Sequence, residues 1–437
     1  MYYVDFTGGV LMDKTDILIA GGGAAGIMAA LAASGSGAGV TVIEKMPVLG
    51  KKILATGNGK CNYTNYYQSK ECYRSSSGDG SLFAWNALKK FGCRETVGLF
   101  KKYGIMPYEK DGYVYPLPGQ ASSVRDILER QLKNTDTVIN TDEKVVKAKI
   151  HINKKSRQQD GFIIETDKKQ YFARKFVIAT GGKAGFVHGS DGSGYKIAKC
   201  LGHSVIPPLP ALTSCILDEK FLKDWAGVRT KGTVSALDST GQLLCKDSGE
   251  LQFVAQGISG IPVFQVSRYI SEELYNKRKP CLIIDIMPLY SAKEIASELK
   301  RRRTDPVNHS AGDMLEGILN SRLALALLKK CGIPVKRGAL EITDKEISKI
   351  AKSMKEWRLN PQATGGFDKA QVTCGGIPVP EINGDTMQSR ICSGLYFAGE
   401  IADIDGICGG YNLQWAWTSG YIAGSSAGKS CINSRIK

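Results

Sequence analysis

A glycine turn between an apolar run and an alanine-rich run is the feature that most constrains this chain. Asp16–Ala20 has the pattern of a short buried strand, Ala24–Ser34 that of a helix, and Val40–Ile43 that of a second strand. The turn between the first strand and the helix reads Gly21-Gly-Gly-Ala-Ala-Gly26, a G-x-G-x-x-G spacing. This order of strand, glycine turn, helix and strand predicts a doubly wound α/β domain.

The three motif glycines each meet a steric demand of a bound dinucleotide. Gly21 permits the tight turn, Gly23 lets the backbone approach a pyrophosphate, and Gly26 lets the helix pack closely on the strand. The free N–H groups at the helix N-terminus face the anion. Glu44 ends the second strand, where a carboxylate accepts both ribose hydroxyls of an adenosine. We therefore predict that an adenine dinucleotide binds at Gly21, Gly23, Ala24, Ala25, Gly26, Glu44 and Lys45.

FAD and NAD both satisfy the glycine motif, so the choice between them depends on two later apolar runs. Phe176–Gly182 and Gly394–Glu400 each read as a strand that ends in a glycine turn, and in FAD-type domains such strands return the chain to the cofactor. Asp403 follows and is predicted to hold the ribityl chain. Residues 409–414 open a helix expected over Trp415–Ala427, with its positive N-terminus toward the flavin N1 and O2. The FAD contacts predicted from the later segments are Val146, Ala179, Thr180, Gly181, Gly399, Glu400, Asp403, Gly410, Tyr411, Asn412 and Leu413.

The uncharged run Ile17–Ile43 is long enough to cross a bilayer. Its glycines divide it into strand, turn, helix, turn and strand, which a lipid-facing segment does not tolerate, so we expect no membrane insertion. The 12 cysteines form no C-x-x-C pair and no secretory leader precedes them, so we predict reduced thiols in the cytoplasm, with no disulfide framework and no metal site. The residues before Met12 are assigned no function.

Five segments together carry a family resemblance. They are Gly50–Asn65, Thr373–Ile377, Thr386–Met387, Gly394–Glu400 and Gly409–Gln414. On these motifs, the chain from Met12 to about Gly424 resembles the YhiN/BaiN-like FAD-dependent oxidoreductases. The resemblance implies an α/β fold: a discontinuous Rossmann-like FAD-binding domain with an inserted β-barrel domain, which itself carries a small helical insert.

The hydrophobic pattern agrees with this layout, because residues 207–288 are strand-like and residues 291–358 are helix-like. No second G-x-G-x-x-G follows a strand, so NAD(P)H is expected to dock transiently over the flavin. The predicted boundaries are 12–205 and 372–437 for the FAD-binding domain, 206–288 and 359–371 for the barrel, and 289–358 for the helical insert.

The Gly50–Asn65 segment combines cations with glycines. Lys51 and Lys52 come shortly after Glu44 and are predicted to neutralise pyrophosphate charge. Gly57 and Gly59 allow the backbone to approach the ring. The resemblance brings five further side chains near the flavin: Thr56, Asn58, Lys60, Cys61 and Asn62. The chain departs from the family pattern at Lys60 and at Tyr113, where arginine is expected. The exchange at Tyr113 loses a charge and with it the basis for a borrowed substrate contact.

Members of the resembled family are associated with reducing carbon–carbon double bonds conjugated to a carbonyl. One branch acts on unsaturated 3-oxo bile acids, and another forms dihydrouridine in ribosomal RNA. In both reactions hydride adds to the β carbon, a donor stabilises the enolate oxygen, and an acid protonates the α carbon. The candidate donors are Cys61, Tyr115 and Tyr411. A structural cysteine packed under the ring explains Cys61 equally well.

Charge bears on the choice of substrate. The net charge is +16, and residues 290–358 contain 15 Lys or Arg against 9 Asp or Glu, including Lys300–Arg303. Such a helical insert would track the phosphates of an RNA, although charge runs on helices are also typical of solvated faces. On charge we place a ribosomal RNA uridine ahead of an unsaturated 3-oxo bile acid or steroid, and both stay open. An amine oxidase and a non-catalytic flavin-binding protein are the alternatives, and the oligomeric state is left open.

Overall fold

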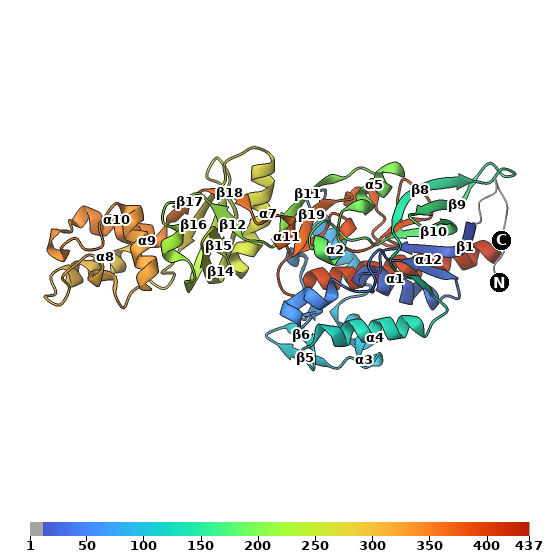
Figure 1. The fold of residues 1–437 in the computed structure, drawn as a ribbon, viewed down its shortest axis with the longest axis horizontal. Coiled ribbons are helices and arrows are strands. Elements are labelled where there is room, and N and C mark those ends of the chain that lie inside the picture. Colours follow the sequence, from blue (N-terminus) through green and yellow to red (C-terminus); the bar gives the residue numbers. More distant parts are fainter. Residues whose placement is uncertain (1–11, 437) are drawn as a thin grey trace. The chain divides into compact units, whose positions relative to one another are not determined.

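The computed structural model describes residues 12–436, so the residues before Met12, which were assigned no function, lie outside the described part. The chain forms two compact units. Unit 1 contains residues 12–208 and 372–436, and unit 2 contains residues 209–371 (Figure 1). The chain therefore leaves unit 1, builds unit 2 and returns. The strands β11 (Ile206–Ala211) and β19 (Val372–Gly376) lie at these two passages.

Unit 1 is built on a mixed seven-stranded sheet. Its strands are β1 (Met12–Ala20), β2 (Val40–Ile43), β7 (Val138–Asn140), β8 (Val145–Ile152), β9 (Gln159–Thr166), β10 (Gln170–Ile178) and β20 (Leu395–Phe397). The order is β7-β2-β1-β10-β9-β8, and β20 also pairs with β10. The pairs among β7, β2, β1, β10 and β20 are parallel, whereas β8 and β9 are antiparallel. The predicted α/β class is confirmed, and β20 brings the late part of the chain into the same sheet as β1.

The predicted strand–helix–strand motif is confirmed closely. The helix α1 (Ala24–Ser34) and β2 have the predicted bounds, and β1 begins four residues before the predicted Asp16. The helix predicted over Trp415–Ala427 belongs to a longer one, α12 (Tyr411–Ile436). The other helices of unit 1 are α2 (Gly80–Leu88), α3 (Cys93–Lys102), α4 (Ala121–Lys133) and α5 (Ser193–Cys200), with short 3-10 turns η1 (Ile53–Gly59), η2 (Lys70–Cys72), η3 (Phe186–His188), η6 (Val379–Glu381) and η7 (Gly399–Ile401).

Two small sheets complete unit 1. One contains β3 (Thr64–Asn65), β6 (Tyr113–Pro116) and β5 (Pro107–Lys110) in that order, and the other pairs β4 (Tyr73–Arg74) with β21 (Asp405–Gly406). Within residues 12–436, no helix combines the length and the apolar character that a bilayer span requires.

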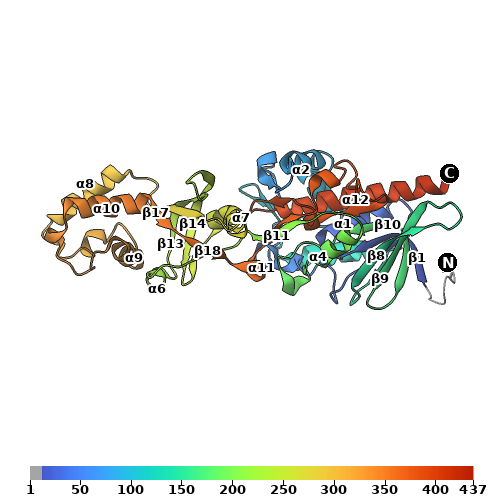
Figure 2. The same ribbon diagram turned by 90° about the horizontal axis from the view of Figure 1, so that it is seen from above.

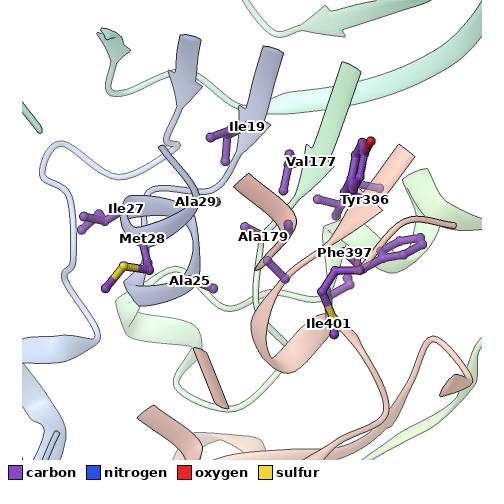
Figure 3. Close-up of a cluster of buried hydrophobic side chains, with 14 of the residues drawn as sticks. Ile19, Ala25, Ile27, Met28, Ala29, Val177, Ala179, Tyr396, Phe397 and Ile401 are labelled. Carbon is purple, nitrogen blue, oxygen red and sulfur yellow. The ribbon is translucent and has the colours of Figure 1, made fainter. Parts of the chain in front are cut away.

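The core of unit 1 lies between the central strands and α1. Ile19 of β1, Val177 of β10 and Phe397 of β20 gather near Ala25 and Ala29 of α1, and all are buried (Figure 3). The small alanines let the helix lie close to the sheet. This contact fixes the start of α1, and so the glycine turn that precedes it.

The helix α12 runs alongside α1 (Figure 2). It carries glycines four residues apart, a spacing that places them on one helix face. A Cβ at Gly420 would lie 2.4 Å from the Ala25 carbonyl oxygen, and one at Gly424 would lie 2.0 Å from that of Ala29. The absence of side chains here therefore allows the two helix backbones to meet.

Unit 2 is built on an antiparallel seven-stranded sheet of its own. Its strands are β12 (Cys215–Leu217), β13 (Arg229–Leu237), β14 (Leu243–Val254), β15 (Gly257–Ser259), β16 (Cys281–Asp285), β17 (Trp357–Leu359) and β18 (Pro361–Thr364). The order is β17-β16-β13-β14-β15-β12-β18. The edge strands β17 and β18 follow each other directly in the chain. Closure of this sheet into the predicted barrel stays a prediction, as do the predicted domain boundaries.

Residues 207–288 were expected to be strand-like, but they also contain two helices, α6 (Leu222–Trp225) and α7 (Ile261–Tyr275). In α7 the buried Val263, Val266 and Ile270 recur at helical spacing, and Pro262 suits a first helical turn. Between β16 and β17 the chain is helical, as the pattern predicts. The elements there are α8 (Ala292–Arg303), η4 (Asp313–Leu315), α9 (Ser321–Cys331), η5 (Ala339–Glu341) and α10 (Asp344–Lys355), and α11 (Gly366–Lys369) follows β18.

Candidate functional site

The glycine turn after β1 has the geometry that a pyrophosphate requires. Gly21 has φ +103°, and a Cβ there would lie 2.5 Å from the Ala179 carbonyl oxygen. A Cβ at Gly26 would lie 1.8 Å from the Gly21 oxygen. By contrast, a Cβ at Gly23 would meet no atom of residues 12–436 within 4 Å. Gly21 and Gly26 are thus required by packing, whereas Gly23 faces open space at the N-terminus of α1, where an anion is favoured.

A cavity opens beside this turn at the carboxyl ends of β1 and β2. It brings together four residues predicted to bind the cofactor, namely Gly21, Glu44, Lys45 and Thr180. The rest of its lining comes from Ala20, Ile43, Glu143, Lys144, Val145, Gly189 and Ser193. The carboxyl ends of parallel strands are the usual ligand edge of such a sheet.

Glu44 lies where the motif predicts it, at the end of β2. One carboxylate oxygen accepts a hydrogen bond from the Gly22 N–H at 2.6 Å, and the other accepts one from the Met46 N–H at 2.8 Å. Burial raises the pKa of Glu44, and these backbone donors counteract that effect. Each oxygen keeps a second lone pair, so the carboxylate can still accept the two ribose hydroxyls.

The strand β8 reaches the cavity through Val145, one residue before the predicted Val146. Neighbouring residues in a strand point to opposite faces. The Val145 side chain is buried, whereas Val146 is 49% exposed and is not part of the lining. The side chain that lines the cavity is therefore that of Val145, and cofactor binding at Val146 stays a prediction.

Three buried polar atoms of unit 1 test whether its residues fit FAD. Thr180 Oγ1, Tyr195 Oη and Asn62 Oδ1 have no hydrogen-bond partner within the described part of the chain. Thr180 lines the cavity, and Asn62 Oδ1 would lie 2.9 Å from a Cβ on Gly410 at the start of α12. Burial, and then the charges of nearby Glu400 and Asp403, raises the pKa of Tyr195. An unpartnered buried polar atom is costly, so a long polar ligand that satisfies these atoms fits the residues present.

Lys52 and Glu400, both predicted to bind the cofactor, are paired with each other. Lys52 Nζ lies 3.1 Å from Glu400 Oε2 and donates to the Ala184 carbonyl oxygen at 2.9 Å. The other Glu400 oxygen accepts a hydrogen bond from the Thr373 N–H at 3.1 Å. Lys52 thus already has a carboxylate partner within the protein, and its predicted role in neutralising pyrophosphate stays a prediction. Lys51 is half-exposed and keeps the predicted role.

Asp403 is fully buried and holds a serine loop. Its Oδ2 accepts hydrogen bonds from Ser75 Oγ and Ser77 Oγ, both at 2.7 Å, and from the Ser76 N–H at 2.9 Å. Its Oδ1 accepts one from the Gly375 N–H at 3.1 Å. These donors give Asp403 a positioning role, and its Oδ1 keeps a second lone pair, so the predicted ribityl contact stays a prediction.

The predicted flavin-facing loop is tightly wound after η1. Gly57, Asn58, Gly59 and Cys61 all have positive φ angles. Thr56 is half-buried, and Gly57, Asn58 and Gly59 are exposed, so the loop presents its backbone. Cys61, however, is fully buried, and burial raises the pKa of its thiol to about 12. Burial removes the access to substrate that a proton donor needs, which favours the structural explanation of Cys61.

The first turn of α12 contains Gly410, Tyr411, Asn412 and Leu413. The Tyr411 hydroxyl is buried and donates to the Tyr67 carbonyl oxygen at 2.8 Å. The Asn412 side chain accepts from the Gly406 N–H at 2.7 Å and donates to its carbonyl oxygen at 2.9 Å. These side chains therefore anchor the helix start to neighbouring loops, and the role of Tyr411 as a proton donor stays a prediction.

Tyr115 is the remaining candidate donor. It lies on β6 half-buried, and its ring would be 3.8 Å from a Cβ on Gly57. Its hydroxyl makes no hydrogen bond to any residue between 12 and 436. Burial, followed by the neighbouring Tyr113 and Cys408, raises the pKa of Tyr115, so the phenol stays protonated at neutral pH. Of the three predicted donors, only Tyr115 combines access with an available proton.

Several site residues escaped the sequence reasoning. Asp191 joins Lys45 at 2.7 Å to Lys144 at 2.9 Å, and Gly189 and Ser193 form part of the cavity wall. The run of small residues Gly189–Gly194 was the available signal, because it lies between a strand–turn segment and the helix α5. It was missed because it has no fixed spacing to the glycine motif.

The cations expected to contact RNA are largely paired with acids of unit 2. Glu298 lies 2.8 Å from both Arg301 and Arg302, and Asp344 lies 2.7 Å from both Lys300 and Arg303. Further pairs join Lys329 to Asp224, Lys330 to Glu219, and Arg337 to Glu346. These cations therefore already have acidic partners, although the 15 Lys and Arg of residues 290–358 still outnumber the 9 acids there and leave an excess of positive charge.

Comparison with known proteins places the site in a wider context. A family profile described as HI0933-like protein Rossmann domain matches residues 15–426. A protein of Clostridium scindens named 3-dehydro-bile acid delta(4,6)-reductase is 39% identical over 94% of this chain and 98% of its own. A protein of Escherichia coli named ribosomal RNA dihydrouridine synthase is 29% identical over 94% of this chain and 97% of its own.

Among solved structures, a 3-ketosteroid-delta4-(5alpha)-dehydrogenase from Rhodococcus jostii is similar with a TM-score of 0.50. It is 14% identical, and the match covers 98% of this chain and all of the other. At that identity the likeness concerns the fold alone.

Proposed function

Because the chain belongs to the HI0933-like family, we propose that it is an FAD-dependent ene-reductase that uses NAD(P)H and reduces an unsaturated 3-oxo bile acid or steroid. The membership of the chain among FAD-dependent oxidoreductases is the premise, and the substrate is the proposal. The observation that carries the proposal is the 39% identity, over nearly the whole chain, to the protein named as a bile acid reductase. The pairing of the helical cations with acids further favours a small substrate over RNA.

Bound FAD would supply hydride transfer. The residues that would hold it are the glycine turn and Glu44 at the adenosine end, and Thr180, Asn62 and the first turn of α12 farther along. The N–H groups at the start of α1 would balance the pyrophosphate, with Lys51 nearby in sequence. The role of the chain is thus to bind and orient.

Tyr115 would complete the reduction of the conjugated double bond. When the β carbon of the substrate gains hydride, the α carbon must gain a proton. We assign that proton to the Tyr115 hydroxyl, because it is accessible, unpartnered within the described residues and next to Gly57. Its raised pKa keeps the donor protonated well above neutral pH.

A uridine in ribosomal RNA is the second candidate substrate. The net charge of +16 and the similarity to the protein named as a dihydrouridine synthase favour it. The two candidates share one reaction logic, because the C5=C6 bond of uridine is also conjugated to a carbonyl. They differ in the contacts required, since RNA needs many unpaired cations.

An anaerobic spectroscopic experiment tests the proposal. NADH or NADPH should bleach the purified yellow protein, and a 3-oxo-Δ4 steroid should restore the oxidised spectrum while an rRNA fragment does not. If no nicotinamide bleaches the protein, the reductase assignment is wrong. If oxygen alone restores the spectrum rapidly and no enone matters, an amine oxidase is favoured instead.

Replacement of the proposed donor sharpens the test. We expect Tyr115→Phe to slow reoxidation by the steroid by about 100-fold or more, because general acid catalysis contributes ~10²–10⁴-fold. Bleaching by NAD(P)H should not change. The control is Tyr421→Phe, the same chemical change on α12, where the ring stacks on Phe91 at 4.1 Å. Unchanged reoxidation in Tyr115→Phe would remove Tyr115 from the mechanism.

A further inference from the structure

The strands β5 and β6 form an antiparallel hairpin of unit 1 (Figure 1), and several of its large apolar side chains are exposed. In an antiparallel pair, directly opposed residues lie on the same face. Tyr108 opposes Tyr115 and Lys110 opposes Tyr113, while the Leu117 N–H donates to the Met106 carbonyl oxygen and extends the ladder. We call the six residues of this side the hairpin face: Met106, Tyr108, Lys110, Tyr113, Tyr115 and Leu117.

The two sides of the hairpin differ sharply. On the inner side Val114 and Pro116 are buried, as expected for a small sheet packed on its unit. On the hairpin face Met106 is 53% exposed, Tyr108 48% and Leu117 60%. Large apolar side chains gathered on one exposed surface are typical of a binding site.

The hairpin face borders two glycine-containing loops of the predicted flavin site, one at Gly57 and the other at Gly409. The Tyr115 ring would be 3.8 Å from a Cβ on Gly57, and the Tyr113 ring would be 3.0 Å from a Cβ on Gly409. Glycine at these positions leaves the tyrosine rings in contact with backbone. A ligand on the hairpin face would therefore reach the loops that are expected to present the flavin.

The charge on the hairpin face is that of a single cation. Lys110 is exposed and, among residues 12–436, has no ion-pair partner. Glu109 belongs to the other side, where it opposes Val114 and accepts from the Gly112 N–H at 2.6 Å. A polyanion would need several such cations, whereas one cation suits a carbonyl oxygen that gains negative charge during the reaction.

We propose that the hairpin face recognises the fused rings of the substrate, an inference that rests on the proposed function. The carbonyl end lies toward Lys110, the double bond lies beside Tyr115, and the remaining rings lie over Tyr108 and on to Met106 and Leu117. This order follows the strand, because residues 106 to 110 span ~14 Å at 3.4 Å per residue. Tyr108, Met106 and Leu117 thus determine specificity, and Lys110 assists the reacting carbonyl.

The test compares a tetracyclic and a monocyclic enone on the intact, FAD-loaded protein. The probes are a 3-oxo-Δ4 steroid and 2-cyclohexenone, which share the reacting group and differ in the rings beyond it. In a Met106→Gln, Leu117→Gln double variant we expect the KM for the steroid to rise at least about 10-fold, the usual scale for lost apolar contacts. The kcat/KM for cyclohexenone and the rate of bleaching by NAD(P)H should stay unchanged.

Two further variants complete the design. Ile152→Gln alters a similarly exposed apolar residue on β8 and should change the kinetic constants for neither enone. Lys110→Gln should lower kcat for both enones, because both present the same carbonyl. Retained flavin content in each variant shows that unit 1 is folded.

Each remaining outcome contradicts a different statement. If wild type reduces neither enone, the proposed function fails. Suppose instead that wild type reduces both enones. If the double variant then leaves the kinetic constants for both unchanged, or alters them equally, the hairpin face does not recognise the rings. If only the KM for NAD(P)H rises, the hairpin face binds the nicotinamide nucleotide instead.

Discussion

At the scale of single residues, Asp191 links two parts of the adenosine end of the site. It contacts Lys45 after β2 and Lys144 before β8, and its Oδ1 accepts from the Ser193 N–H at 2.9 Å. Partial burial by itself would raise the pKa of Asp191, but the hydrogen bonds from Lys45, Ser193 and Lys144 lower it well below its usual range. One carboxylate thus holds two cations of the cavity wall.

We expect Asp191→Asn to lower the free energy of unfolding by about 1–3 kcal/mol at pH 7, the usual range for charged hydrogen bonds. Because the folded pKa is depressed, this contribution is complete above the unfolded pKa of ~3.9 and declines as the pH falls below it. Urea unfolding of both proteins between pH 7 and pH 3 measures the difference. The exposed Asp385→Asn, which loses a surface pair with Lys90, is the control and should leave the free energy of unfolding nearly unchanged. A gap that widens toward acid pH would contradict this account.

The sequence predicted site residues well where the backbone geometry of a turn or strand requires a residue type at a fixed spacing. Gly21, Gly26 and Glu44 lie where the motif predicts them. Lys52, Asp403 and Tyr411 were predicted as ligands from their positions, and the sequence did not reveal that each also has a partner within the protein. Such partners come from loops distant in sequence, which no local pattern encodes.

At the scale of elements, the contact between α1 and α12 depends on glycines that lack room for a side chain. Strong short-range signals allowed α1 and β2 to be predicted with their bounds. The helix α7 was missed, although its buried positions recur at helical spacing, because the apolar runs on either side of it read as strands. The pairing of β20 with β10 joins residues more than 200 positions apart and is not visible in a local pattern.

We expect Gly424→Ala to destabilise unit 1 by about 1–3 kcal/mol, because the new methyl group would lie 2.0 Å from the Ala29 carbonyl oxygen. This cost exceeds the gain in helix propensity of ~1 kcal/mol. Chemical unfolding and the flavin content after purification measure the effect. In the control Gly98→Ala, on α3, the methyl group meets nothing within 4 Å, and the change should stabilise by about 0.5–1 kcal/mol. Equal stability of the two variants would contradict the packing argument.

At the scale of the whole molecule, the two units have separate hydrophobic cores. The residues predicted to bind FAD all belong to unit 1. The core of unit 2 has its own large aromatic residues, including Trp225 and Trp357 with ring centroids 5.4 Å apart. The two units are therefore expected to respond differently to the cofactor.

Calorimetry should resolve two unfolding transitions, one for each unit. Added FAD should raise the midpoint temperature of only one of them. A ligand at 100 times its Kd stabilises the state that binds it by about 2.7 kcal/mol. Repeating the scan with Trp357→Phe, which changes only the core of unit 2, should shift the transition that FAD leaves in place. A single transition that moves as a whole with FAD would show that the units unfold together.

The helix packing also has a consequence for the order of folding during synthesis. Residues 209–371 are synthesised before β20 and α12, so the strands of unit 2 are complete while unit 1 still lacks a sheet neighbour and the partner of α1. The nascent chain must therefore carry β1, α1 and the glycine turn in an unfinished state through most of translation. Flavin can be captured only at the end, when the last segment arrives.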